Sequence, residues 1–259
     1  MKAQMAPVLS IARMTFSEVL RNKVMYGVLL FLAILLLTAA ALASVTMGRT
    51  EMMILDAGFG GISILSNLMA IILTIQSLQQ EKESRTLYVL LVRLTSRWQY
   101  ILGKFIGLAA VLGGLTILMC LLLILLVFLV GTPFWPSVIQ ACAATVLEVW
   151  LVIAIAMIFA QSSSLFLAIL LTLCIDVAGR FTSTIQQFGQ QADSEYLHWL
   201  TEAMYYLLPN LEAVNLRSAA GYIEIYGHET LIGIVAYSFG EIVFLLLVCM
   251  FIFERRNLS

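Results

Sequence analysis

Long apolar runs separated by short polar stretches make up most of this chain. We predict that six of these runs are membrane-spanning helices, because a helix needs about 20 apolar residues to cross the hydrocarbon core of a bilayer. The predicted spans cover approximately residues 24–45, 58–78, 101–130, 137–160, 165–179 and 231–253. The pattern therefore predicts an all-α polytopic membrane protein that forms a single domain over residues 1–259.

The composition agrees with this prediction. The 259 residues are 62% hydrophobic and 11% charged, whereas a soluble domain carries about 25% charged residues. Membrane lipid is thus the expected surrounding of the chain. Nucleic acid is not an expected partner, because the sequence offers no basic soluble surface that would neutralise phosphates.

The basic residues indicate the orientation of the spans, because cytoplasmic loops of membrane proteins are enriched in Lys and Arg. Most of the 14 basic residues precede the first span, follow the second span or end the chain: Lys2, Arg13, Arg21, Lys23, Lys82, Arg85, Arg93, Arg97, Lys104, Arg255 and Arg256. We therefore predict that both termini and the charged stretch 79–107 are cytoplasmic. The acidic segment 180–230 is predicted to lie outside.

Three polar or amphipathic segments connect to these spans. Residues 6–22 are predicted to form an amphipathic helix in the membrane interface, where it serves as an anchor or contacts a partner. The first outer loop is predicted to contain Arg49, Glu51 and Asp56. Between the fifth and sixth spans, apolar residues at helical spacing up to Pro209 predict a re-entrant or surface helix that caps the outer end of the bundle, with a plain outer-surface helix as the alternative.

The charged stretch 79–107 combines two helix signals. Four leucines at helical spacing, Leu87, Leu90, Leu91 and Leu94, predict a short amphipathic helix. The pattern Ser96-x-x-Gln99 is a capping box that predicts the start of the next helix. We therefore expect a helix parallel to the membrane, followed by a tight turn into the third span.

The sequence contains no recognisable catalytic or metal-binding constellation. The two histidines, His198 and His228, lack the spacing of a Ser-His-Asp triad or a zinc site. Gly103-Lys104 is not a phosphate-binding loop, because Phe105 replaces the required Ser or Thr. We therefore predict that this chain is not an ATPase and holds no metal or cofactor of its own.

Ionisable residues within predicted spans are candidate functional residues, because an unpaired charge in the bilayer costs several kcal/mol. Glu148 lies in the fourth span and Glu241 in the sixth. They line a substrate path, or they pair with polar groups of neighbouring helices. Asp176 and Arg180, four residues apart, are expected to form a structural pair.

The charged stretch also resembles a known family. The residues from Glu81 to Leu91, then Ser96-Arg-Trp and Leu102-Gly-Lys-Phe, are similar to the loop between the second and third spans of ABC type-2 permeases, the membrane subunits of ATP-binding-cassette exporters. Leu208-Pro-Asn and the Glu254-Arg-Arg-Asn-Leu ending resemble this family as well. The chain departs from the family pattern at Arg85, where Gly is frequent, and at Leu94, where Pro is frequent.

The resemblance implies a two-fold dimer with a second permease copy, either identical or different, in a bacterial or archaeal cytoplasmic membrane. It also implies ATPase subunits from another polypeptide, which bind ATP and Mg²⁺. The segment from Glu83 to Leu91 would be the coupling helix. The residues expected to couple to the ATPase are Glu81, Lys82, Glu83, Arg85, Thr86, Leu87, Leu90, Leu91 and Arg93.

Three functions follow as hypotheses. The first is a permease subunit of an exporter, for which a lipid-like or hydrophobic cargo is one candidate. The second is an ion-coupled transporter that uses Glu148 and Glu241, although the chain lacks the inverted repeat and the broken spans of that class. The third is a subunit that transmits ATPase motion without transport, which the absence of a sizeable outer domain makes less favourable.

Overall fold

A computed structural model describes residues 2–21, 50–83, 97–129, 136–190, 195–216 and 227–255, together with positions 26, 30, 33, 34 and 37. Within these residues every regular element is helical. The elements are α1 (Lys2–Arg21), α3 (Thr50–Glu83), α5 (Arg97–Leu129), α6 (Pro136–Ser162), α7 (Leu165–Arg180), α8 (Thr182–Gln190), α9 (Glu195–Leu207), the 3₁₀ helix η1 (Glu212–Val214) and α10 (His228–Arg255).

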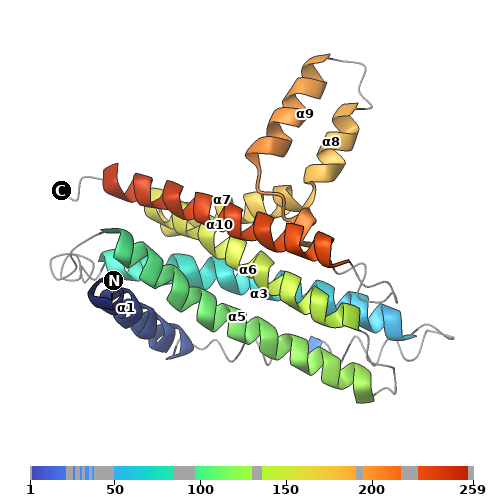
Figure 1. The fold of residues 1–259 in the computed structure, drawn as a ribbon, viewed down its shortest axis with the longest axis horizontal. Coiled ribbons are helices and arrows are strands. Elements are labelled where there is room, and N and C mark those ends of the chain that lie inside the picture. The colour runs from blue at the N-terminus through green and yellow to red at the C-terminus, as the bar shows by residue number, and fades with distance from the viewer. Residues whose placement is uncertain are drawn as a thin grey trace.

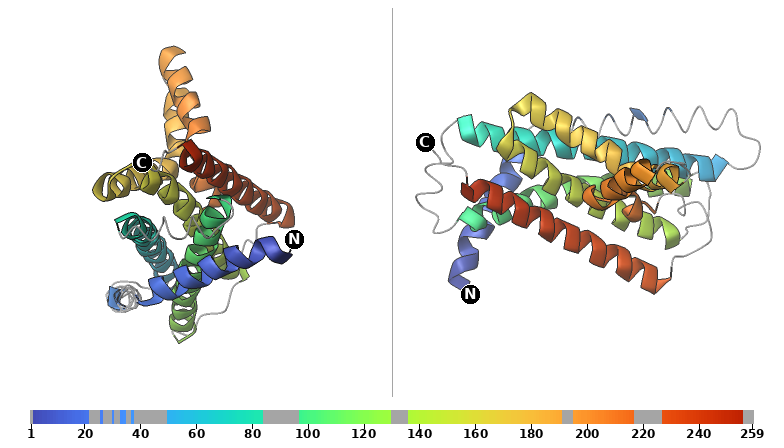
Figure 2. Two further views of the ribbon diagram at one scale, coloured as in Figure 1. Left: turned by 90° about the vertical axis from the view of Figure 1, so that its left-hand side faces the viewer. Right: turned by 90° about the horizontal axis from the view of Figure 1, so that it is seen from above.

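Four of these helices, α3, α5, α6 and α10, are long and apolar enough to cross a membrane. They run along one common direction and form an elongated bundle (Figures 1 and 2). The prediction of an all-α protein with several spans is therefore confirmed for the described residues. The six-span topology stays a prediction, because α7 has only 16 residues and the predicted span 24–45 lies almost entirely outside the described residues.

Helix α6 forms the centre of the bundle. It packs against α3, α5, α7 and α10, and 72% of its most apolar window is buried, compared with 17% for α10. Small residues such as Ala154, Ala156 and Ala160 are fully buried on α6, and they allow neighbouring helices to approach closely. Helix α10 is therefore the most peripheral of the four long helices.

Helix α1 crosses the beginning of α5, and this crossing marks what we call the α1 end of the bundle (Figure 1). The crossing depends on two glycines of α5 spaced by four residues. A Cβ atom at Gly103 would lie 2.9 Å from the Val8 carbonyl oxygen, and one at Gly107 would lie 2.7 Å from the Ala12 carbonyl oxygen. Only glycine permits this approach, so α1 is fixed against α5 by backbone packing.

The structure corrects the predicted boundaries of α3. The helix begins at Thr50, so Glu51 and Asp56 are helical and not part of a loop; Arg49 lies outside the described residues. Acidic residues are compatible with the first turns of a helix, where they interact favourably with the helix dipole. At its other end α3 continues to Glu83, because the residues after Gln79 are good helix formers.

Helix α5 begins at Arg97, directly after the predicted capping residue Ser96, which lies outside the described residues. The predicted amphipathic helix of the charged stretch falls within residues 84–96 and also lies outside them.

The region between α7 and α10 differs from the prediction. Two helices, α8 and α9, pack against each other as a hairpin, whereas the sequence predicted a single helix. Figure 1 and the left view of Figure 2 show this hairpin projecting away from the side of the bundle, and the right view of Figure 2 places it between the two ends, so it does not cap an end of the bundle. Helix α8 (Thr182–Gln190) is rich in polar residues and has no apolar run that would predict a helix. Its packing against α9 explains why it is helical.

Candidate functional site

A buried polar cluster joins α3, α6 and α7; we call Ser63, Asn67, Glu148, Asp176 and Arg180 the mid-bundle cluster. Arg180 Nη2 lies 2.7 Å from Glu148 Oε1, and Arg180 Nε lies 3.3 Å from Asp176 Oδ2. Asn67 Nδ2 donates hydrogen bonds of 3.1 Å to Glu148 Oε1 and to Asp176 Oδ1. Ser63 Oγ donates to Glu148 Oε1 at 3.1 Å.

Most of the mid-bundle cluster is buried, and its most exposed side chain, Arg180, is 23% exposed. Glu148 is 2% exposed, and Ser63 and Asn67 are buried as well. Charge-assisted hydrogen bonds of this kind are the stronger ones, and a buried carboxylate that loses its partner carries a large desolvation cost. The cluster therefore holds α3, α6 and α7 together. One atom in it, Asn67 Oδ1, has no hydrogen-bond partner among the described residues.

A second polar group lies at the α1 end; we call Glu18, Glu81, Tyr100 and Lys104 the α1-end junction. The Lys104 side chain is 0% exposed, and its Nζ lies 2.6 Å from Glu81 Oε1 and 3.6 Å from Glu18 Oε2. The Tyr100 hydroxyl donates a hydrogen bond to the Glu81 carboxylate. The junction thereby connects α1, α3 and α5, directly beside the stretch 84–96.

The last turn of α3 also binds the end of α6. Gln79 Nε2 donates to the carbonyl oxygens of Ala160 at 3.1 Å and Ser163 at 2.8 Å. Lys82 Nζ donates to the Ala160 carbonyl oxygen and, at 3.3 Å, to that of Gln161. The final carbonyl groups of a helix lack partners within the helix and attract cations. These contacts therefore tie α3 to α6 at the α1 end.

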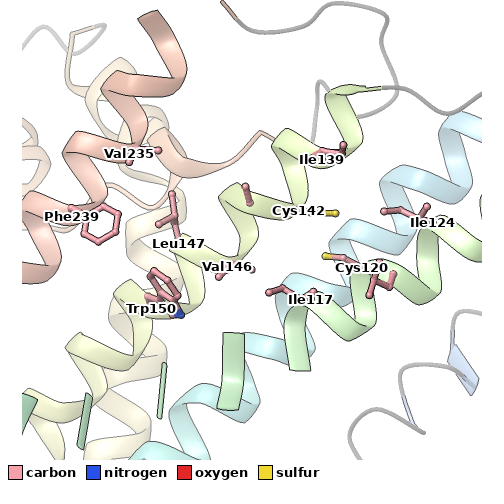
Figure 3. A pocket seen from close by; sticks show the side chains of 12 residues that line it. Ile117, Cys120, Ile124, Ile139, Cys142, Val146, Leu147, Trp150, Val235 and Phe239 are labelled. Carbon is pink, nitrogen blue, oxygen red and sulfur yellow. The ribbon is translucent and has the colours of Figure 1, made fainter. Parts of the chain in front are cut away.

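An apolar pocket of about 620 Å³ lies between α5, α6 and α10 (Figure 3). Its lining includes Ile117 and Cys120 of α5, Cys142 and Trp150 of α6, and Phe239 of α10. Among the residues that the structure describes, no charged side chain lines it. The pocket is separate from both polar groups described above.

The predicted coupling residues fall largely on the stretch between α3 and α5. Glu81 and Lys82 belong to the polar contacts at the α1 end, and Glu83 is the last residue of α3. The remaining predicted coupling residues lie outside the described residues: Arg85, Thr86, Leu87, Leu90, Leu91 and Arg93.

The predicted intramembrane residues separate into two places. Glu148, Asp176 and Arg180 come together in the mid-bundle cluster, whereas Glu241 forms no hydrogen bond or ion pair with the cluster among the described residues. Sequence reasoning missed Ser63 and Asn67. The available signal was an Asn within an apolar run, four residues after a Ser on the same helix face.

Sequence reasoning also gave no binding role to Lys104 or Tyr100 at the α1 end. Lys104 was visible as a cation at the start of a span, but its two carboxylate partners are distant in sequence. Across the parts of the chain that the structure describes, no group of three or more His, Cys, Asp or Glu side chains could hold a metal ion.

The parallel apolar helices and the polar contacts between them define a multi-pass helical membrane protein. A family model described as "ABC-2 family transporter protein" matches residues 9–258, nearly the whole chain, and the chain therefore belongs to this family. The match confirms the resemblance found in the sequence. No curated protein matches the chain.

Proposed function

We propose that this chain is the permease subunit of an ATP-binding-cassette exporter, driven by ATP that separate ATPase subunits bind with Mg²⁺ and hydrolyse. Membership of the ABC-2 transporter family over residues 9–258 is the observation that carries the proposal. In this proposal the chain has six spans, both termini and the α1 end face the cytoplasm of a bacterial or archaeal cell, and two permease copies form the transport unit.

The construction of the α1 end supports a role in receiving force. Helix α3 ends at Glu83 and α5 begins at Arg97, so the stretch between them is directly continuous with two long helices. The Glu81–Lys104 ion pair links these two helices, about one turn from that stretch on α3 and about two turns from it on α5. A displacement of the stretch by an ATPase subunit would therefore move both helices together.

Helix α1 would move with them. Its backbone lies against Gly103 and Gly107 of α5, and Glu18 faces Lys104 at 3.6 Å. The stretch 84–96, with the predicted coupling helix from Glu83 to Leu91, would thus act on a unit of three helices. Leucines of the coupling helix would pack against the ATPase, and its charged residues would set the register by polar pairing.

The mid-bundle cluster supports transmission of this motion along α3. This helix is continuous over 34 residues, and Ser63 and Asn67 in its other half hold Glu148, Asp176 and Arg180. A movement of α3 would therefore reach α6 and α7 and change the packing between the two permease copies. The close engagement of Glu148 by Arg180 favours this structural role over a substrate path, and hence over the ion-coupled alternative.

Purification of the chain with its co-expressed ATPase tests the proposal. ATP hydrolysis is compared in lipid vesicles for the wild-type complex and for the variants Glu83→Ala and Arg85→Ala. We expect these variants to lose the dependence of hydrolysis on the permease. Arg13→Ala serves as the control, because Arg13 is exposed on α1 and its charge lies outside the coupling stretch.

Two results would contradict the proposal. One is that no nucleotide-hydrolysing protein associates with the chain. The other is that a cysteine placed at position 85 reacts with a membrane-impermeant thiol reagent added to the outside of intact cells, because the coupling stretch would then lie on the wrong side of the membrane.

A further inference from the structure

The apolar pocket between α5, α6 and α10 has a floor that is fixed by packing (Figure 3). The Trp150 indole N–H donates a 3.1 Å hydrogen bond to the Ala109 carbonyl oxygen. The ring fits beside Gly113, where a Cβ atom would lie 2.9 Å from Trp150 Nε1. Phe239 of α10 packs edge-on against it, with ring centroids 6.4 Å apart. Such a preformed surface binds a ligand without first having to become ordered.

The pocket presents no polar group that a ligand would need to satisfy. The indole N–H is already used by the Ala109 carbonyl oxygen, and the thiols of Cys120 and Cys142 lie close to each other. Figure 3 shows their sulfur atoms pointing toward one another. Because a buried polar group without a partner is costly, the occupant that fits this lining is a hydrocarbon.

The dimensions of the pocket match one leaflet of a membrane. Ile139 and Trp150, two lining residues of α6, are about 16 Å apart along the helix at a rise of about 1.5 Å per residue. Half of the hydrocarbon core is about 15 Å thick. The pocket therefore extends from near the membrane mid-plane, at Trp150, to the boundary of the leaflet at the end of the bundle opposite α1.

The pocket opens onto the surface of the bundle. Ile117, Leu121, Ile139 and Phe239 of the lining are also exposed on the bundle surface. The pocket is therefore continuous with the apolar surface that faces the membrane.

We propose that this pocket binds one acyl chain of a membrane phospholipid from the leaflet opposite the α1 end, with the methyl end of the chain at Trp150 and its ester end beyond Ile139. The bound chain would fill the space between α10 and the other two helices. Helix α10, which is the least buried of the long helices, would thereby be held to the bundle by lipid. This inference depends on the membrane location of the helices and not on ATP-driven transport.

Quenching of Trp150 fluorescence by brominated lipid tests the proposal. The protein keeps Trp150 alone, with Trp98, Trp135 and Trp199 changed to Phe, and is placed in phosphatidylcholine vesicles whose acyl chains carry bromine either near the ester or near the methyl end. We expect bromine near the methyl end to quench Trp150 at least twofold more strongly. The variant Ala143→Phe, which places a ring in the pocket, should reduce that quenching at least twofold.

The matched control is Ala110→Phe, because Ala110 is exposed on α5 and does not line the pocket; its quenching should equal that of the parent. Val146→Phe, a second pocket-filling change, replaces Ala143→Phe if circular dichroism shows that the latter loses helix. Equal quenching in the filled and unfilled proteins overturns the proposal, since lipid would then reach Trp150 by another route. Absence of quenching by either lipid also overturns it, since protein, such as a second copy, would then cover the pocket.

Discussion

The mid-bundle cluster and the α1-end junction are both buried polar groups that join three helices, but they differ in their access to water. Glu148 of the cluster is 2% exposed and receives hydrogen bonds from two other helices. In the junction, Lys104 is buried but its partner Glu18 has a side chain that is 35% exposed. The Glu148 carboxylate must therefore satisfy its charge within the protein, although Arg180 of the cluster is 23% exposed, whereas the junction has water available to one of its carboxylates.

This difference indicates how each polar group responds to force or mutation. A charge in the hydrocarbon region has no alternative partner when its own is removed, so the cluster is expected to stay closed. A charge at the boundary exchanges its partner for water at low cost. Within the junction, the Glu18–Lys104 contact is therefore the connection that can loosen, whereas the Glu81–Lys104 pair keeps α3 and α5 together beside the stretch through which we propose that force enters.

The largest effect is expected from Arg180→Met, which leaves Glu148 and Asp176 without their cation. Removing one partner of a buried ion pair costs about 3–5 kcal/mol, so we expect a clear drop in the thermal unfolding midpoint of the detergent-solubilised protein. Arg255→Met is the control, because Arg255 is exposed and contacts only the Phe251 ring at 4.3 Å among the interactions described for it. Equal midpoints for the two variants would show that the cluster is not buried as described.

A smaller effect is expected from Gly107→Val, which tests whether packing or charge holds α1 to α5. The new side chain would meet the Ala12 backbone, and overpacking of this kind costs about 1–3 kcal/mol. We expect the Gly107→Val variant to have a lower thermal unfolding midpoint and to release α1 faster during proteolysis. Gly114→Val is the matched control, because a Cβ atom at Gly114 meets nothing within 4 Å; if both variants behave alike, the close crossing does not hold α1.

The Lys104–Glu81 pair should show an interaction free energy of about 1.5–3 kcal/mol, because its 2.6 Å hydrogen bond joins two charged groups with little exposure. A double-mutant cycle with Lys104→Met and Glu81→Gln measures this value from unfolding midpoints. Additive effects of the two changes would contradict the assignment of Lys104 as the link between α3 and α5.

The smallest effect is expected for Glu18→Gln. The 3.6 Å separation from Lys104 and the 35% exposure of the Glu18 side chain place this pair among surface ion pairs, which contribute about 0–1 kcal/mol. A cycle with Lys104→Met should therefore give a smaller interaction free energy than the Glu81 cycle, and one that decreases in high salt. An interaction free energy with Lys104 as large as that of Glu81 would contradict the difference in access to water between the cluster and the junction.

Much of the fold was accessible from local sequence patterns. The runs behind α5, α6 and α10 were recognisable because each is apolar over the length of a span, and the start of α5 followed from the capping pattern at Ser96 and Gln99. The start of α3 was misplaced, because Glu51 and Asp56 are polar in sequence yet helical in the structure. Only one helix of the α8–α9 hairpin was predicted, because α8 has no apolar run and is stabilised by its contacts with α9.

By itself the sequence determined that this is a helical membrane protein, since hydrocarbon thickness and backbone hydrogen bonding act on each segment separately. Its motifs and the family match, which are also properties of the sequence, placed it in the ABC-2 transporter family. Only the tertiary structure decided which polar residues meet. Asn67 and its partner Glu148 are 81 residues apart, and Ser63 and its partner Arg180 are 117 residues apart. Lys104 meets Glu18 because two glycines let α1 approach α5. These contacts depend on where and at what angle two helices cross, and the spacing of residues within one segment does not determine that.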